Sequence, residues 1–560
     1  MNGSVNGARL TCVSRINSTI HAGPLLATEA WLAYRGVMKL FNAFATVGSL
    51  TLVSRVLGFA RDILIAAALG TGAVADAFFV AFRFPNLFRR LFGEGAFNAA
   101  FVPMYARKLE GDGEVEAARF ASHAMGGLAL VLIVLSASAM LAMPWLMVVL
   151  APGFAEDPAK YDLTVTLTQI AFPYLLCLSL VALISGALNA HHKYWAAAAA
   201  PILLNIVLII AITIAVLLGY GGVAGAGYIL SVGVLFAGVG QLALLWIAMR
   251  AAGLRIQFGR PTFDADMRRL VKLGIPGLVA GGITQINIVV GTVIASLQAG
   301  AVSYLYYADR LYQLPLGIVG IAIGVVLLPE LARQLRSGDQ ARVIDTQNRS
   351  LEFALLLTLP SAVGLSVAAY PIISVLFERG AFDATATPQT ANALVAFAIG
   401  LPAFVLIKVF QPAFFAREDT ATPMRYAFVN LVVNVIGSLC LFFGLSQVGI
   451  SGHIGIALAT SVAGWVNALL LCWRLSSDGS FAGDAQLLRA TLAAIVGSAV
   501  MGAVLWFGLP LAEPWLISSQ PIVLRALALL GVIGLAGALY FAIVFATGAL
   551  RVSHFRRRTA

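Results

Sequence analysis

Long apolar segments separated by short polar or charged turns make up most of the chain. Residues 124–155 and residues 194–249 contain no formal charge. About 20 apolar residues cross a bilayer as a helix, so each of these stretches is long enough for one or two spans. The segments are too long and too uniformly apolar for the strands of a membrane barrel, which predicts α-helices throughout.

Fourteen segments are predicted to cross the membrane. They are residues 43–69, 74–104, 122–150, 163–189, 197–218, 226–249, 270–297, 303–331, 350–377, 389–415, 424–445, 453–473, 489–510 and 522–549.

Composition excludes a water-soluble protein. Of the 560 residues, 60% are hydrophobic and only 11% are charged, and the mean hydropathy is +0.92. Soluble domains carry about 25% charged residues. Four scattered cysteines form no CxxC or Cys/His pattern, so neither a disulfide framework nor a metal site is predicted.

The positive charge is distributed in a way that orients the chain. Alternate connections, counted with both termini, carry 26 Lys and Arg residues, whereas the opposite side carries only Lys160, Arg379 and Arg525. Because Lys and Arg are enriched in cytoplasmic loops, both termini are predicted to be cytoplasmic. Orientation therefore explains the net charge of +11 without a nucleic-acid partner.

Short matches at one offset indicate an internal duplication. Residues 101–109 (FVPMYARKL) recur as residues 327–335 (LLPELARQL), 226 positions later. Arg83 and Arg310 are 227 positions apart, as are Gly153 and Gly380. Two copies of six spans enter the membrane in the same direction, which is a parallel repeat, and substrate is expected at midplane between them.

This repeat divides the chain into four parts. We interpret residues 1–37 as a disordered extension or a misassigned start, and residues 38–262 as a first lobe of six spans. Residues 263–480 form a second lobe of six spans, and residues 481–560 hold two further spans and a basic cytoplasmic tail. The predicted fold is an all-α polytopic membrane protein.

Seven cations lie inside predicted spans and away from the span ends. They are Arg55, Arg61, Arg83, Arg89, Arg90, Arg310 and Lys408, and the acids Asp62, Asp76, Glu94 and Asp309 oppose them. An Arg at a helix centre costs about 2.5–3.5 kcal/mol to insert, so such residues face a wet cavity or a partner. The spacing of seven residues puts Asp76, Arg83 and Arg90 on one helix face.

Two interpretations of these charges stay open. Single pairs can simply neutralise each other: Arg61 with Asp62 or Asp76, Asp309 with Arg310, and Arg90 with Glu94. The whole set nevertheless contains seven cations and four acids, so about three cations have no acidic partner. An anionic ligand would compensate them, and the planar guanidinium suits bidentate binding of phosphate.

Several motifs closely resemble the MurJ/MviN family of bacterial lipid II flippases. They are SRVLGFARD at residues 54–62, DAFFVAFRFPNLFRR at residues 76–90, EGAF at residues 94–97, FVP at residues 101–103, APGF at residues 151–154 and YYADR at residues 306–310. The resemblance extends from Met38 to about Arg558.

The resemblance implies a fold similar to MATE-like exporters, with two extra C-terminal helices forming a groove for the lipid tail. It implies transfer of undecaprenyl-pyrophosphate-linked disaccharide-pentapeptide from the cytoplasmic to the outer leaflet for peptidoglycan synthesis, without enzymatic turnover. The substrate-binding residues carried over by motif are Arg55, Arg61, Asp76, Arg89 and Arg310. Further cavity or gating residues are Asp62, Arg83, Arg90, Glu94 and Asp309.

The expected mechanism is alternating access in the bacterial inner membrane. Lipid II, membrane lipid and other cell-wall synthesis proteins are the expected partners. No cofactor is expected, because the chain lacks a GxxxxGK[ST] loop, and the membrane potential or a counter-ion would drive the cycle. Some relatives are thought to use sodium, but spans 7, 11 and 12 contain no Asp or Glu here.

Rival functions make different predictions. A MATE-like exporter would take another anionic or lipid-linked substrate, and a cation-coupled drug exporter would need an acidic cavity. A membrane enzyme for lipid-linked sugars could use the DxD formed by Asp264 and Asp266, although Asp264 is better placed as the N-cap of the following helix. His191 and His192 are expected to be solvated loop residues, and a nonenzymatic scaffold would not need charged spans.

Overall fold

A computed structural model describes the backbone of residues 24–89 and 98–549 and most of their side chains from Thr46 onward. This part of the chain is helical and contains no β-strand, only an isolated bridge between Arg379 and Phe382. Ten of the described helices are long and apolar enough to cross a membrane, with α6 and α7 taken together as one span. Many large apolar side chains are exposed, as expected for helices that face lipid. The all-α membrane fold is therefore confirmed.

The first lobe contains the helices up to residue 251. They are α2 (Pro24–Leu69), α3 (Ala73–Arg89), α4 (Asn98–Gly111), α5 (Glu114–Leu150), the short η2 (Pro152–Glu156), α6 (Pro158–Ala171), α7 (Tyr174–Ala190), α8 (Trp195–Leu217) and α9 (Ala224–Ala251).

The second lobe and the two helices after it follow a connection of thirteen residues, 252–264. They are α10 (Ala265–Ser296), α11 (Ala301–Arg336), α12 (Gln340–Val367), α13 (Ala369–Phe377), α14 (Ala386–Phe415), α15 (Ala421–Gln447), α16 (Gly452–Ser477), α17 (Ala485–Leu516) and α18 (Ile522–Ala546).

The span predicted for residues 74–104 covers α3 and the start of α4, and its residues 90–97 lie outside the described part; every other predicted span coincides with one helix or with two consecutive helices. The span predicted for residues 163–189 is interrupted at Phe172 and Pro173, between α6 and α7, and the span for residues 350–377 is interrupted at Ala368, between α12 and α13. Helix α2 begins at Pro24, so it includes residues 24–37 of the predicted extension, whereas residues 1–23 lie outside the described part. The total of fourteen spans stays a prediction.

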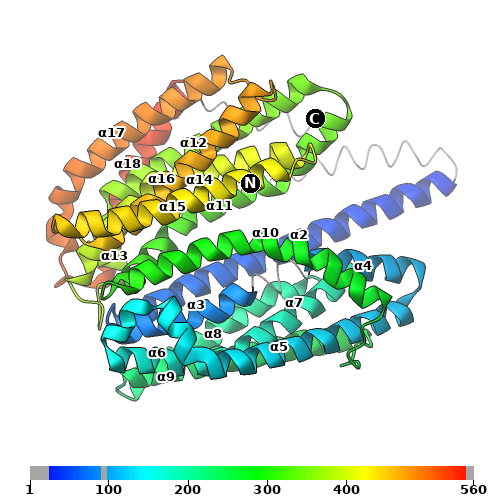
Figure 1. The fold of residues 1–560 in the computed structure, drawn as a ribbon. Helices are drawn as coiled ribbons and strands as arrows, with labels where there is room; N and C mark the ends of the chain where they lie inside the picture. The colour runs from blue at the N-terminus through cyan, green and yellow to red at the C-terminus, as the bar shows by residue number, and fades with distance from the viewer. Residues whose placement is uncertain (1–23, 90–97, 550–560) are drawn as a thin grey trace.

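The helices form two packed bodies (Figure 1). In the first lobe α2 packs on α8, α8 on α9, and α3 on α6; in the second, α14 packs on α11, α12 and α16. Helix α17 packs on α18 and on α12, which attaches the last two helices to the second lobe. Helix α10 contacts α15 in its own lobe and also α4, α5 and η2 in the first lobe, so it lies between the two bodies.

Besides these contacts of α10, the lobes meet through a set of close contacts at one end of the molecule, which we call the lobe junction. It consists of the backbone contacts made there by Ala67, Gly70, Gly153, Ser296, Gly380 and Ala381. The Ala381 amide donates to the Ala67 carbonyl at 2.7 Å, and the Gly153 amide donates to Ser296 Oγ at 3.2 Å. These residues lie at the ends of the first, third, seventh and ninth predicted spans or just after them, and the loops there are predicted to be periplasmic.

Candidate functional site

An acid shared between the lobes lies at the centre of the charged residues. Arg61 Nη2 on α2 is 2.7 Å from Asp62 Oδ1, and Arg310 Nε on α11 is 3.5 Å from Asp62 Oδ2. The Tyr306 hydroxyl donates to Asp62 Oδ1 at 3.2 Å. We call these four residues the Asp62 cluster: two guanidinium groups share one carboxylate, which leaves a net positive charge.

Neighbouring groups fix the two arginines differently. Arg61 is 6% exposed, and its Nη1 donates to Asn205 Oδ1 on α8 at 2.9 Å. Arg310 lies 4.6 Å from the centre of the Tyr306 ring, a cation–π contact. The Arg310 side chain remains 34% exposed, so it is the accessible cation of the cluster.

Arg55 lies on the same helix but has no acidic partner. Its side chain is exposed, and among the described residues no carboxylate oxygen lies within 4 Å of it. A methyl group added to Gly317 on α11 would lie 2.4 Å from Arg55 Nη1, so the guanidinium rests against that glycine. Lys408 on α14 is also exposed and passes near Gly320, one turn further along α11.

Asp76 is held by the protein itself. It is fully buried, and Lys160 Nζ on α6 donates to its Oδ2 at 2.7 Å. The Gly300 amide donates to the same oxygen at 2.9 Å. Ser303 donates to Oδ1 from its amide at 3.0 Å and from its hydroxyl at 2.6 Å. The carboxylate therefore bonds α3 to the start of α11 near the lobe junction.

The remaining predicted residues are less central. Arg83 Nη1 on α3 donates to Thr292 Oγ1 on α10 at 2.7 Å, which places this contact between the lobes. Asp309 accepts from the Gln313 side chain one turn along α11, while Arg310 pairs with Asp62 and not with Asp309. Arg90 and Glu94 lie outside the described residues, as does the side chain of Arg89.

Close backbone approaches at the lobe junction follow the internal repeat. A methyl group on Gly153 would lie 2.3 Å from the Ser296 carbonyl oxygen at the end of α10. One on Gly380 would lie 2.2 Å from the Ala67 carbonyl oxygen near the end of α2. Gly380 also has a φ of 60°, which disfavours any side chain there. The predicted repeat pairs the two glycines, and each contacts the opposite lobe, Gly153 from η2 and Gly380 from the turn after α13.

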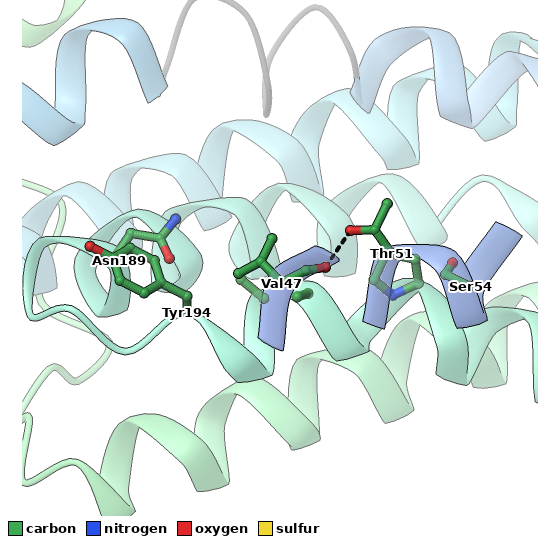
Figure 2. Close-up of a pocket in the computed structure, with 8 residues that line it drawn as sticks. Val47, Thr51, Ser54, Asn189 and Tyr194 are labelled. Carbon is green, nitrogen blue, oxygen red and sulfur yellow. Dashed lines mark hydrogen bonds between the residues drawn. The ribbon is translucent and has the colours of Figure 1, made fainter. Parts of the chain in front are cut away.

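A pocket of about 300 Å³ lies beside α2 on the side of α8 (Figure 2). Val47, Ala197, Ala198 and Pro201 form apolar walls, and Thr51, Ser54, Asn189 and Tyr194 also line it. The Thr51 hydroxyl donates to the Val47 carbonyl at 2.7 Å (Figure 2). None of the described residues that line this pocket is charged, so it is distinct from the Asp62 cluster.

The residues considered for an enzyme have structural partners. Asp264 accepts from the Met267 amide at 2.9 Å, which confirms it as the N-cap of α10. Asp266 pairs with Lys108 on α4 at 2.8 Å, and His191 Nε2 lies 2.9 Å from the Tyr105 hydroxyl. Within the described residues, no three His, Cys, Asp or Glu side chains could hold a metal ion.

Lys160 lies in a helix and not in the loop that the charge pattern predicts for it. Asp157 caps α6 and Pro158 begins it, so Lys160 lies in the first turn of the helix and is 8% exposed. Tyr306 and Asn205 were missed as well. Tyr306 precedes Arg310 by one helical turn, a spacing that could have indicated its place in the cluster.

Comparisons with known proteins agree on one family. The sequence model described as "Lipid II flippase MurJ" matches residues 65–525. A "Probable lipid II flippase MurJ" of Rhizobium meliloti is 50% identical over 93% of this chain and 96% of its own length. A "Lipid II flippase MurJ" of Burkholderia cenocepacia is 34% identical over 93% of this chain and all of its own length.

Solved structures agree in fold. The structure titled "Lipid II flippase MurJ, inward closed conformation" superimposes with a TM-score of 0.71 at 26% identity, over 89% of this chain and 99% of that one. An inward-facing multidrug resistance MATE family transporter of the MOP superfamily has a TM-score of 0.63 at 13% identity, covering 78% of this chain and 98% of that one. The second likeness is one of fold alone.

Proposed function

We infer from these comparisons that the chain belongs to the MurJ family of lipid II flippases and that it moves lipid II across a membrane as a transporter. We propose the bacterial cytoplasmic membrane as its location, with both termini in the cytoplasm, because 26 Lys and Arg residues lie on that side against three on the other. The direction of transfer is then from the cytoplasmic to the outer leaflet.

We propose that the pyrophosphate of lipid II binds to Arg55 and Arg310. The observation that carries this proposal is the surplus of positive charge: Arg61 and Arg310 share Asp62, and Arg55 has no described acidic partner. Both Arg55 and Arg310 are accessible and lie on α2 and α11, so a diphosphate could bridge the lobes with charge-assisted hydrogen bonds. Asp76 would instead stabilise the closed lobe junction, since hydrogen bonds from Lys160, Gly300 and Ser303 already occupy both its oxygens.

Alternating access would complete the cycle. The sugar-peptide head group would occupy a hydrated cavity between the lobes while the prenyl tail stays in lipid, and the lobe junction would open to release the head group outside. An inside-negative potential favours outward movement of an anion by about 2.3 kcal/mol per charge per 100 mV. Export of another anionic or lipid-linked substrate is the alternative, and membership in the flippase family argues against it.

The test is transport in sealed vesicles that contain purified protein and fluorescent lipid II. Replacing Arg310 or Arg55 by Ala should reduce the initial flipping rate at least about tenfold, because a charge-assisted hydrogen bond contributes about 1.5–3 kcal/mol. Lys193→Ala, which removes an exposed cation from the turn after α7, is the matched control and should leave the rate unchanged. Wild-type rates in both arginine variants would contradict the proposed phosphate site.

A further inference from the structure

Arg379 and Arg525 lie beside one another on the side of the membrane that is predicted to carry only three cations. Of those three, Lys160 is neutralised by Asp76. Arg379 follows α13, and its Nη2 donates to the carbonyls of Val375 and Leu376 at 2.8 and 2.7 Å. Arg525 on α18 donates from Nη2 to Ser374 Oγ at 2.7 Å. Both guanidinium groups are therefore anchored to the same turn of α13.

Within the described part of the chain, both guanidinium groups are hydrogen-bonded only to uncharged groups. Arg525 Nε donates to the Leu516 carbonyl at 3.1 Å, and no carboxylate oxygen lies within 4 Å of either guanidinium among the described residues. The neighbouring acid Glu378 is engaged by Thr387, whose hydroxyl donates to it at 2.9 Å. The pair therefore has excess positive charge.

Burial makes this excess charge significant. Arg525 is only 4% exposed, whereas Arg379 is exposed and keeps Nε and Nη1 free of the described hydrogen-bond partners. Partial desolvation of the guanidinium, together with the positive charge of Arg525, lowers the pKa of Arg379. The first backbone N–H groups of α18 add a partial positive charge, and the N-cap Pro521 offers no side-chain acceptor for them. A buried cation next to a second cation is costly unless an anion compensates it.

The surroundings match the boundary between hydrocarbon and head groups. Large apolar side chains at the ends of α17 and α18 are exposed around the pair, among them Trp515, Ile517, Ile522 and Val523. Trp is typical of the membrane–water interface. A free anion would meet Arg379 from water, whereas a lipid phosphate could reach it with its acyl chains lying along these apolar side chains.

We propose that Arg379 and Arg525 form a second anion site, which binds the phosphate group of an outer-leaflet lipid where α13 and α18 meet. The two arginines would supply charge-assisted hydrogen bonds to the phosphate oxygens, with Arg525 fixed by Leu516 and Ser374 and Arg379 reaching from the loop. The choice of leaflet rests on the proposed orientation. The phosphate site itself does not, so the binding test below can fail while lipid II transport is intact.

Native mass spectrometry of the full-length protein in detergent tests the proposal. Titration with phosphatidylglycerol should reveal one tightly retained lipid on the wild type, and Arg379→Gln should weaken its apparent affinity at least fivefold. Arg425→Gln removes an exposed arginine at the opposite end of the second lobe and is the matched control, for which the tightly retained lipid should persist. Arg525→Lys keeps the charge and should retain more lipid than Arg525→Gln.

The source of the phosphate is distinguished in the same experiment. Displacement of phosphatidylglycerol by millimolar inorganic pyrophosphate would support recognition of the phosphate group whatever carries it. Retention of the lipid despite pyrophosphate, with loss in Arg379→Gln, would support a site that requires lipid. Equal binding by wild type and Arg379→Gln, or the absence of a retained lipid on the wild type, would overturn the proposal.

Discussion

At the scale of single residues, equal formal charges have different environments. Asp62 lies between two arginines and leaves a positive surplus, whereas Asp76 is neutralised by Lys160 and by donors from α11. Both aspartates stand in motifs typical of the family, and composition alone does not separate them. The difference arises from the tertiary fold, because Lys160 and Ser303 are distant from Asp76 in sequence.

Replacement of Asp76 by Asn should destabilise the protein strongly. The change leaves Lys160 buried without its counter-charge, which costs about 3–5 kcal/mol. The measurement is the apparent melting temperature in detergent. Asp112→Asn, which removes an exposed partner of Lys108, is the control and should change the melting temperature little. Adding Lys160→Met to Asp76→Asn should recover part of the loss, and no recovery would argue against an electrostatic origin.

At the scale of the elements, the apolar pattern places the described helices to within a few residues. The length of an apolar stretch predicts a helix, and the charged turns predict its ends. The pattern could not place the interruptions between α6 and α7 and between α12 and α13, because the residues that border them are as apolar as the helices. It also could not show that α10 contacts both lobes, since such contacts depend on tertiary packing.

The N-cap of α10 provides a test at this scale. Asp264→Ala should destabilise the start of α10 by about 1 kcal/mol, whereas Asp264→Ser should cost less because serine can also accept the Met267 amide. The hydrogen bond from that amide lowers the pKa of the Asp264 carboxyl group from its ordinary value of 3.8, so the carboxylate is charged at neutral pH. The stabilisation of α10 by this cap is therefore lost as the pH falls below 3.8. Hydrogen exchange at the first turn of α10 measures the effect. Equal exchange in both variants would contradict a capping role.

At the scale of the whole molecule, the repeat explains the symmetry of the lobe junction. Sequence matches paired Gly153 with Gly380, and the structure places each against a backbone carbonyl of the opposite lobe. The sequence could not reveal these contacts, because a glycine carries no side-chain signal for a partner. The same limit applies to Asp62 and Arg310, whose proximity depends on how the lobes dock.

Alanine at both glycines should force the lobe junction apart. An added methyl group would lie within 2.3 Å of a carbonyl oxygen at each site, so the closed arrangement should lose population. Pulsed electron paramagnetic resonance between labels at Val115 and Ala341, in a variant without the native cysteines, should report shorter distances as the other ends of the lobes approach. Gly127→Ala with Gly444→Ala is the control, because neither glycine has a positive φ and an added methyl group would have no atom within 4 Å at either site. Unchanged distances in the Gly153→Ala and Gly380→Ala double variant would contradict this expectation.

The residues of the Asp62 cluster come from both lobes, so the charge balance of the cluster depends on how the lobes move relative to each other. Arg61 and Asp62 are successive residues of α2, so this pair travels with the first lobe, whereas Arg310 belongs to the second. Separation of α2 from α11 would leave Asp62 compensated by Arg61, whereas Arg310 would lose its ion pair with Asp62. The attraction of Arg310 for an anionic ligand would then increase as the two helices separate. The affinity for the ligand would therefore depend on the conformation of the protein.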